Sequence, residues 1–193
     1  MRGAKSTSAA KRDKGVKIRE MAVEDISDVY RLGYQLFHSL ELTTLYRTWD
    51  AHEVTVNFDQ DPKLSLVAEA KNGRIVGFAL GKTYENETGS WKYGHILWMG
   101  VSPKYQRAGV GAELHQEMER RMRQQGVRMS FVDMAQSNAA ARNFFRSVGY
   151  GRPESEVWMS KMIRRARKKK DTEAHPRLGL PGRRHRMRRP PLA

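Results

Sequence analysis

Hydrophobic and polar residues follow two kinds of repeating pattern between residues 16 and 160. Short runs that alternate or are wholly apolar predict strands, and apolar residues repeated every three or four positions predict amphipathic helices. The predicted strands are 17–21, 64–69, 75–80, 95–101, 128–134 and 157–159. The predicted helices are 26–37, 48–58, 110–126 and 138–148. Because hairpin signals come early and strand–helix–strand units late, we expect an α+β fold, a mixed six- or seven-stranded sheet flanked by about four helices.

The clearest local signal is Asn72-Gly73 between the apolar runs 64–69 and 75–80. Asn-Gly between two such runs is the strongest short-range signal for a hairpin. These two runs are therefore predicted to form an antiparallel hairpin. The apolar run 128–134 is predicted to be a buried strand.

The net charge of the chain is concentrated at its two ends. Lys and Arg number 36 against 21 Asp and Glu, for a net charge of +15. Residues 1–15 and 161–193 carry all of this excess, whereas residues 16–160 are neutral. The C-terminal stretch contains prolines and no aromatic residue, so it cannot bury enough apolar surface to order itself. We predict a flexible basic arm (1–15), a domain (16–160) and a disordered basic tail (161–193) suited to non-specific contact with polyanions.

Several classes of protein are excluded by composition. The chain has no cysteine, which excludes disulfide scaffolds, cysteine-ligated zinc, iron–sulfur clusters and thiol nucleophiles. No run approaches the roughly 18 apolar residues of a membrane helix. We therefore expect a cytoplasmic protein with no membrane partner and no metal site.

A candidate phosphate-binding segment follows the strand 95–101. It reads QRAGVG at 106–111 and opens the long predicted helix. The first amides of a helix have no intrahelical partner, and the helix dipole adds positive charge there. Gly109 and Gly111 remove Cβ atoms that would keep a phosphate from the backbone. The better-known phosphate and dinucleotide loops are absent, so plain packing of helix against strand stays an alternative.

This segment resembles the acyl-CoA motif of the GNAT superfamily of N-acetyltransferases, [QR]-x-x-G-x-[GA] after a hydrophobic strand. A second stretch, NAAARNFF at 138–145 followed by VGY at 148–150, is similar to the family signature N-x-x-A-x-x-[FL]-Y-x-x-x-G-F. The resemblance covers about residues 17–160. It implies a GNAT-like acyl-CoA N-acyltransferase fold, with acetyl-CoA as the co-substrate.

The resemblance also implies which residues hold acetyl-CoA. Backbone groups after the strand would take the acetyl and pantetheine arm, and the amides at the helix start would take the pyrophosphate. The implied cofactor-binding residues are Met99, Gly100, Val101, Gln106, Arg107, Ala108, Gly109, Val110, Gly111, Ala112, Asn138 and Phe145. The family's Tyr, which protonates the leaving thiolate, falls at Phe145, where no hydroxyl exists. Another donor such as Tyr105 or water, unaided departure of the thiolate, or weak activity are the alternatives.

Two side chains are candidates for the catalytic base. His95 follows Gly94, and some N-terminal acetyltransferases of the family carry Gly-His there, whereas lysine acetyltransferases often carry Glu. Asp133 lies at the position where ribosomal-protein N-terminal acetyltransferases carry an acidic proton acceptor. A histidine titrates near neutral pH and suits this role. The plainer alternatives are a packed strand histidine and an ion pair of Asp133 with Arg128.

The resemblance implies an acetyl-CoA-dependent N-acetyltransferase that moves an acetyl group to a primary amine by direct attack on the thioester. A protein N-terminus or lysine is the expected acceptor, as in the protein N-terminal and ribosomal-protein alanine acetyltransferases that the motifs resemble. Two alternatives stay open. One is a small-molecule amine acceptor of the polyamine or aminoglycoside type, and the other is a CoA-binding relic that acts as a polyanion- or ribosome-associated binding protein. The sequence also leaves a homodimer open.

Overall fold

The computed structural model describes residues 15–37, 49–85, 91–151 and 153. By its internal contacts the chain divides into Met1–Arg152 and Pro153–Ala193. All elements described below belong to the first of these units. The predicted basic tail and the closing strand 157–159 lie outside the described residues, as does the basic arm apart from Gly15. The division into arm, domain and tail therefore stays a prediction.

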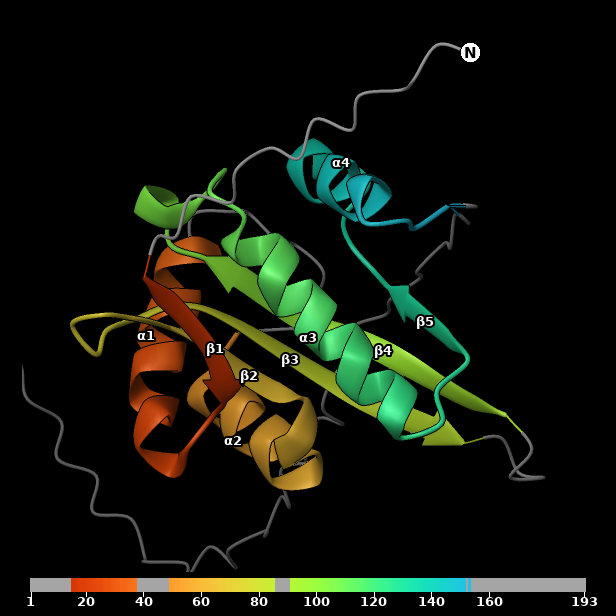
Figure 1. Ribbon diagram of the computed structural model, residues 1–193, viewed down its shortest axis with the longest axis horizontal. Coiled ribbons are helices and arrows are strands. Elements are labelled where there is room, and N and C mark those ends of the chain that lie inside the picture. The colour runs from red at the N-terminus through yellow and green to blue at the C-terminus, as the bar shows by residue number, and fades with distance from the viewer. Residues whose placement is uncertain (1–14, 38–48, 86–90, 152, 154–193) are drawn as a thin grey trace, which may run out of the picture. The chain divides into compact units, whose positions relative to one another are not determined.

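Five strands form one mixed sheet in the described part of the chain, in the order β1-β2-β3-β4-β5 (Figure 1). They are β1 (Val16–Glu20), β2 (Ser65–Ala70), β3 (Ile75–Glu85), β4 (Lys92–Val101) and β5 (Met129–Val132). The first four strands are antiparallel neighbours, and β5 runs parallel to β4. The α+β class with a mixed sheet is thus confirmed.

Helices cover both faces of this sheet. They are α1 (Ile26–Phe37), α2 (Ala51–Gln60), α3 (Val110–Gln124) and α4 (Ala139–Ser147), with 3₁₀ turns η1 (Val23–Asp25), η2 (Pro62–Leu64) and η3 (Pro103–Tyr105). Val29 of α1 and Val54 of α2 pack with Phe78 on one face, and Leu114 and Met118 of α3 pack on the other. Figure 1 shows α3 lying along the sheet. Among the described helices, none is both long and apolar enough to cross a membrane.

The predicted hairpin at Asn72-Gly73 joins β2 to β3. Gly73 has φ +78°, in the left-handed region that favours glycine. Its N–H donates to the carbonyl of Ala70 at 2.9 Å, and the N–H of Ala70 donates to the carbonyl of Arg74 at 2.9 Å. The local sequence therefore sets the turn, and the turn sets the register of the two strands.

β3 and β4 are longer than predicted because they pair with each other beyond their apolar runs. The ladder continues from Gly81 opposite Ile96 to Glu85 opposite Lys92. The register shifts once, since Leu80 pairs with Trp98 and Gly81 with Ile96. Leu97 is therefore an extra residue in β4, which forms a β-bulge.

β5 is shorter and more exposed than predicted. Met129 and Phe131 are 50% and 40% exposed, whereas Val132 packs against the core beneath α3. The hydroxyls of Ser130 and Tyr150 lie 2.7 Å apart. The prediction of a buried strand is wrong, because successive side chains of a strand turn to opposite faces and alternate β5 side chains are exposed.

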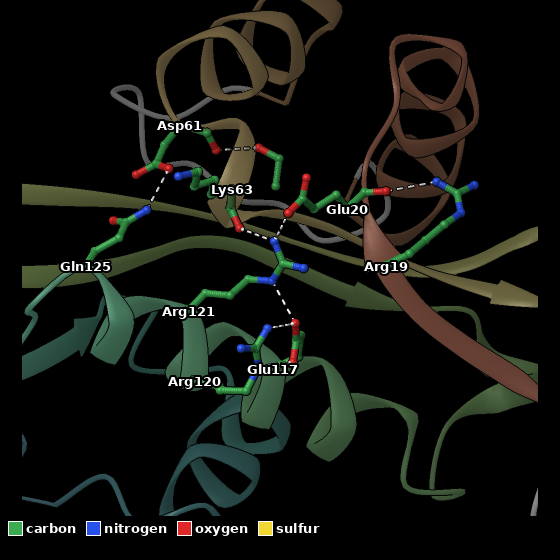
Figure 2. Close-up of polar contacts among 9 residues, drawn as sticks. Arg19, Glu20, Asp61, Lys63, Glu117, Arg120, Arg121 and Gln125 are labelled. Carbon is green, nitrogen blue, oxygen red and sulfur yellow. Dashed lines mark hydrogen bonds and ion pairs between the residues drawn. The ribbon is translucent and has the colours of Figure 1, made fainter.

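An ion-pair network anchors α3 to β1 and η2 (Figure 2). The Nε of Arg121 donates to Glu117 at 2.7 Å, and its Nη1 pairs with Glu20 and donates to the carbonyl of Lys63 at 3.1 Å. Arg120 also donates to Glu117, at 2.6 and 2.7 Å. Hydrogen bonds from Arg120 and then Arg121 lower the pKa of Glu117 to about 2. The network holds the C-terminal half of the helix whose N-terminus carries the candidate phosphate-binding segment.

Candidate active site

β4 and β5 separate beside the residues that the motifs single out. Their parallel pairing runs from Tyr93 opposite Met129 to Ile96 opposite Val132, while β4 continues to Val101. Among the described strands, only β3 pairs with β4 beyond this point. The predicted acyl-arm residues Met99, Gly100 and Val101 lie in this separated part of β4. Their backbone groups on the β5 side thus have no ladder partner among the described strands, and we call this separated part of the sheet the strand opening.

The loop after β4 is tied back to the strand and then turns into α3. Nε2 of Gln106 donates to the carbonyl of Val101 at 2.8 Å. Arg107 has φ +56° and Gly109, the N-cap of α3, has φ +92°. Gly109 has no side chain with which to cap this helix N-terminus, and the first amides of a helix point outward without an intrahelical partner. Gln106, Arg107, Gly109 and Ala112 are all exposed.

Glycine is required at two positions of this segment, for different structural reasons. Gly109 needs its positive φ, and a Cβ there would meet no atom within 4 Å. A Cβ on Gly111 would lie 3.3 Å from Cε2 of Phe144 on α4. Gly111 therefore lets α3 and α4 approach each other, whether or not a phosphate binds nearby. The space in front of Gly109 is open.

The two candidate bases lie in direct contact. Nε2 of His95 on β4 is 2.5 Å from Oδ1 of Asp133, just after β5. The imidazole is 12% exposed and the carboxylate 38%. The parallel register explains the contact, because Phe131 is the partner of His95 and Asp133, two positions on, points to the same face. The sequence had presented His95 and Asp133 as separate alternatives.

An aromatic ring beside this pair was missed in the sequence. The ring of Phe131 stacks on the imidazole of His95, with centroids 4.2 Å apart and planes at 24°. The ring of Tyr84 lies 6.2 Å from that of His95 and 6.4 Å from that of Phe131. One signal in the sequence was available. Phe131 lies two positions before Asp133 in a predicted strand, and side chains two positions apart in a strand point to the same face.

Asn138 and Phe145, from the second signature, have structural roles in this fold. Asn138 is the N-cap of α4, and its Oδ1 accepts from the N–H of Ala141 at 3.0 Å. Phe145 is only 7% exposed and lies in the core beneath α3. Its ring centroid is 5.2 Å from that of Tyr150. Cofactor contacts by Asn138 and Phe145 stay predictions.

Comparison with known proteins identifies the family. The family model described as Acetyltransferase (GNAT) family matches residues 31–150, which span both signatures and the His95–Asp133 pair. The chain belongs to the GNAT acetyltransferase family.

Two curated relatives illustrate the range of this family. One is the N-terminal acetyltransferase A complex catalytic subunit ard1 of Schizosaccharomyces pombe, 26% identical over 125 residues, which are 64% of this chain and 60% of the relative. Another is the mycothiol acetyltransferase of Saccharomonospora viridis, 31% identical over 95 residues, 48% of this chain and 31% of the relative. The chain thus spans less than two thirds of each of these relatives.

Solved structures share the fold. An aminoglycoside acetyltransferase from an uncultured soil metagenomic sample, solved with sisomicin, superposes with a TM-score of 0.62 at 21% identity, covering 79% of this chain and 99% of its own. Ard1 from Thermoplasma volcanium superposes with a TM-score of 0.57 at 24% identity, covering 70% and 82%. At these levels of identity the two structures show a shared fold.

Proposed function

We propose that this GNAT protein is an acetyl-CoA-dependent N-acetyltransferase whose acceptor is a protein N-terminus or a lysine. The observation that carries the proposal is the contact of His95 with Asp133 next to the point where β4 leaves β5. A histidine–carboxylate pair at the edge of an opening is an arrangement suited to taking a proton from an amine.

The residues around the start of α3 fit the acetyl-CoA that the family uses. The exposed, uncapped helix N-terminus behind Gly109 suits the pyrophosphate. Backbone groups of Met99, Gly100 and Val101 would orient the acyl arm in the strand opening. When bound, acetyl-CoA supplies an acetyl group as a thioester.

The protein's own part in the chemistry is to remove a proton and to hold the amine in place. An amine must be neutral to attack, and a lysine amine with a pKa near ~10.4 needs more help than an α-amine near ~8. The new N–C bond forms as the C–S bond breaks, and His95 receives the amine proton. The carboxylate of Asp133, 2.5 Å away, then faces a positively charged imidazolium. Because Phe145 has no hydroxyl, Tyr105 or a water would protonate the thiolate.

The charges next to His95 do not by themselves choose between a peptide and a polycationic small molecule. Lys82 is the cross-strand partner of His95, and the carboxylate of Asp133 contacts the imidazole of His95, so one cation and one anion lie there. The preference for a peptide acceptor rests on the similarity to an N-terminal acetyltransferase catalytic subunit. A polyamine or aminoglycoside acceptor is the second candidate, supported by the fold shared with aminoglycoside acetyltransferases.

The test is acetyl transfer to peptides with free α-amines, to peptides with lysine, to polyamines and to aminoglycosides. We expect His95→Ala to lower kcat/KM at least about 100-fold with acetyl-CoA affinity unchanged by calorimetry. His52→Ala, at an exposed position on α2, is the matched control. If Asp133→Asn abolishes activity and His95→Ala does not, the role of base passes to Asp133. Acetyl-CoA binding without transfer to any amine would favour the CoA-binding relic.

Three further expectations about the whole protein also stay proposals. We place it in the cytoplasm, because it lacks cysteine and a long apolar run. Residues 161–193 would contact polyanions, which a tail deletion and a salt titration of RNA binding would test. A homodimer would be detected by analytical ultracentrifugation.

A further inference from the structure

We propose that Phe131 is a positioning residue that fixes the imidazole of His95 in the plane in which its Nε2 meets Asp133. The inference rests on the proposed function, in which His95 is the base. Nothing in the two family signatures includes Phe131, which lies on β5 ahead of the second one.

The ring of Phe131 lies against one face of the His95 imidazole. His95 and Phe131 are register partners on parallel strands, so their side chains leave the sheet on the same face. Their rings lie 4.2 Å apart at 24°, which is a stacked contact. Asp133 holds one atom of the imidazole at 2.5 Å, but this contact and the bond to Cβ still let the ring twist about the line between Cβ and Nε2. The face of Phe131 removes this freedom, because turning the imidazole out of its plane would drive it into the stacked ring.

The stacked contact excludes orientations of the imidazole that its own torsions would allow. The torsion that turns an imidazole relative to its Cβ is broad and weakly restricted by itself. A catalytic base must be held within hydrogen-bond reach of the proton that it takes, and small misplacements are costly. Phe131 and Asp133 come from one extended segment. This segment therefore sets both the orientation of the imidazole plane and the position of its Nε2 atom.

A plainer role for Phe131 must be separated from this one. The ring is 40% exposed, and scattered exposed apolar residues are common on protein surfaces. It could also contact the acceptor directly. These roles differ in their kinetic effects: loss of positioning lowers kcat through His95 alone, whereas loss of an acceptor contact raises the KM for the acceptor.

The experiment is a double-mutant cycle between Phe131 and His95, measured as thiol release from acetyl-CoA with the best peptide acceptor of the panel. Phe131→Leu removes the ring and keeps an apolar strand residue, and Phe131→Tyr keeps the ring. Met129→Leu is the matched control, because Met129 is exposed on the same strand but pairs with Tyr93. Thermal unfolding of each variant confirms that the fold is retained.

We expect Phe131→Leu to lower kcat roughly tenfold, with both KM values within about twofold, and Phe131→Tyr and Met129→Leu to keep wild-type kcat. In the His95→Ala background, Phe131→Leu should cause no further loss. A further tenfold loss in that background, or a raised acceptor KM at unchanged kcat, overturns the positioning role and leaves the proposed function standing. Full activity of His95→Ala overturns the positioning role and passes the role of base to Asp133. No transfer by the wild type to any amine overturns the proposed function itself, and the positioning role with it.

Discussion

His115 on α3 faces Tyr150, which follows α4, across a buried aromatic interface. Their ring centroids lie 5.6 Å apart with planes at 73°. His115 is 4% exposed, and its Nε2 has no hydrogen-bond partner within the part of the chain that the structure describes. Burial lowers the pKa of His115, against a smaller opposite effect of Glu119. The folded protein therefore keeps this imidazole neutral below the pH at which a free histidine takes a proton.

We predict that His115 makes the protein less stable in mild acid. As the pH falls below about 6.5, the unfolded chain binds a proton at this residue before the folded protein does, so the free energy of unfolding decreases. The decrease continues until the pH passes the lowered pKa of the folded state. His115→Leu should flatten this slope in urea unfolding between pH 5 and 7.5, and His52→Gln, at an exposed position, should not. An unchanged slope in His115→Leu would contradict the prediction.

A second prediction concerns Gly109 and uses Gly73 as its matched control. Both glycines have positive φ, +92° and +78°, and a Cβ on either meets nothing within 4 Å. Gly109→Glu and Gly73→Glu should each cost about 1–2 kcal/mol of stability from backbone strain. Only Gly109→Glu should weaken acetyl-CoA binding, at least roughly tenfold, because it places a carboxylate where the pyrophosphate would lie. Equal acetyl-CoA affinity of the two variants by calorimetry would contradict a pyrophosphate site at the N-terminus of α3.

A third prediction tests the missing hydroxyl at Phe145. The ring is 7% exposed and packs against Tyr150 and His115. Phe145→Tyr would bury a new hydroxyl among these rings, at a cost of about 1–3 kcal/mol if it finds no partner. We expect lower stability in urea and no gain in kcat. A raised kcat at unchanged stability would show instead that this position reaches the departing thiolate, as the family signature implies.

A fourth prediction concerns Glu117, whose pKa of about 2 reflects hydrogen bonds from Arg120 and Arg121. Its carboxylate stabilises the fold above its ordinary pKa of about 4.5, and this contribution is lost as the pH falls from there toward 2. Glu117→Gln should therefore lower stability at pH 7 and reduce the loss of stability between pH 4.5 and 2. Glu119→Gln, in an exposed pair with Arg123, should change acid unfolding less. Identical acid-unfolding curves for the two variants would be evidence against the network around Arg121.

The local elements and the family could be predicted from the sequence alone. The period of its apolar residues set α1, α3 and α4, and Asn72-Gly73 set the hairpin, because both signals arise between neighbouring residues. The segments at 106–111 and 138–145 were sufficient to recognise the GNAT family. They also made His95 and Asp133 candidates for the catalytic base, but as two alternatives.

The contacts between distant segments could not be predicted in this way, because they depend on the pairing of strands in the folded sheet. The ladder between β3 and β4 extends through polar residues, and the bulge at Leu97 shifts its register, because pairing across a sheet can override the pattern of a single strand. His95 and Asp133 are 38 positions apart, and no local period predicts their contact. It follows from the register that sets Phe131 beside His95. A one-residue slip of β5 would turn Phe131 and Asp133 to the opposite face, so the pair exists only in the folded sheet.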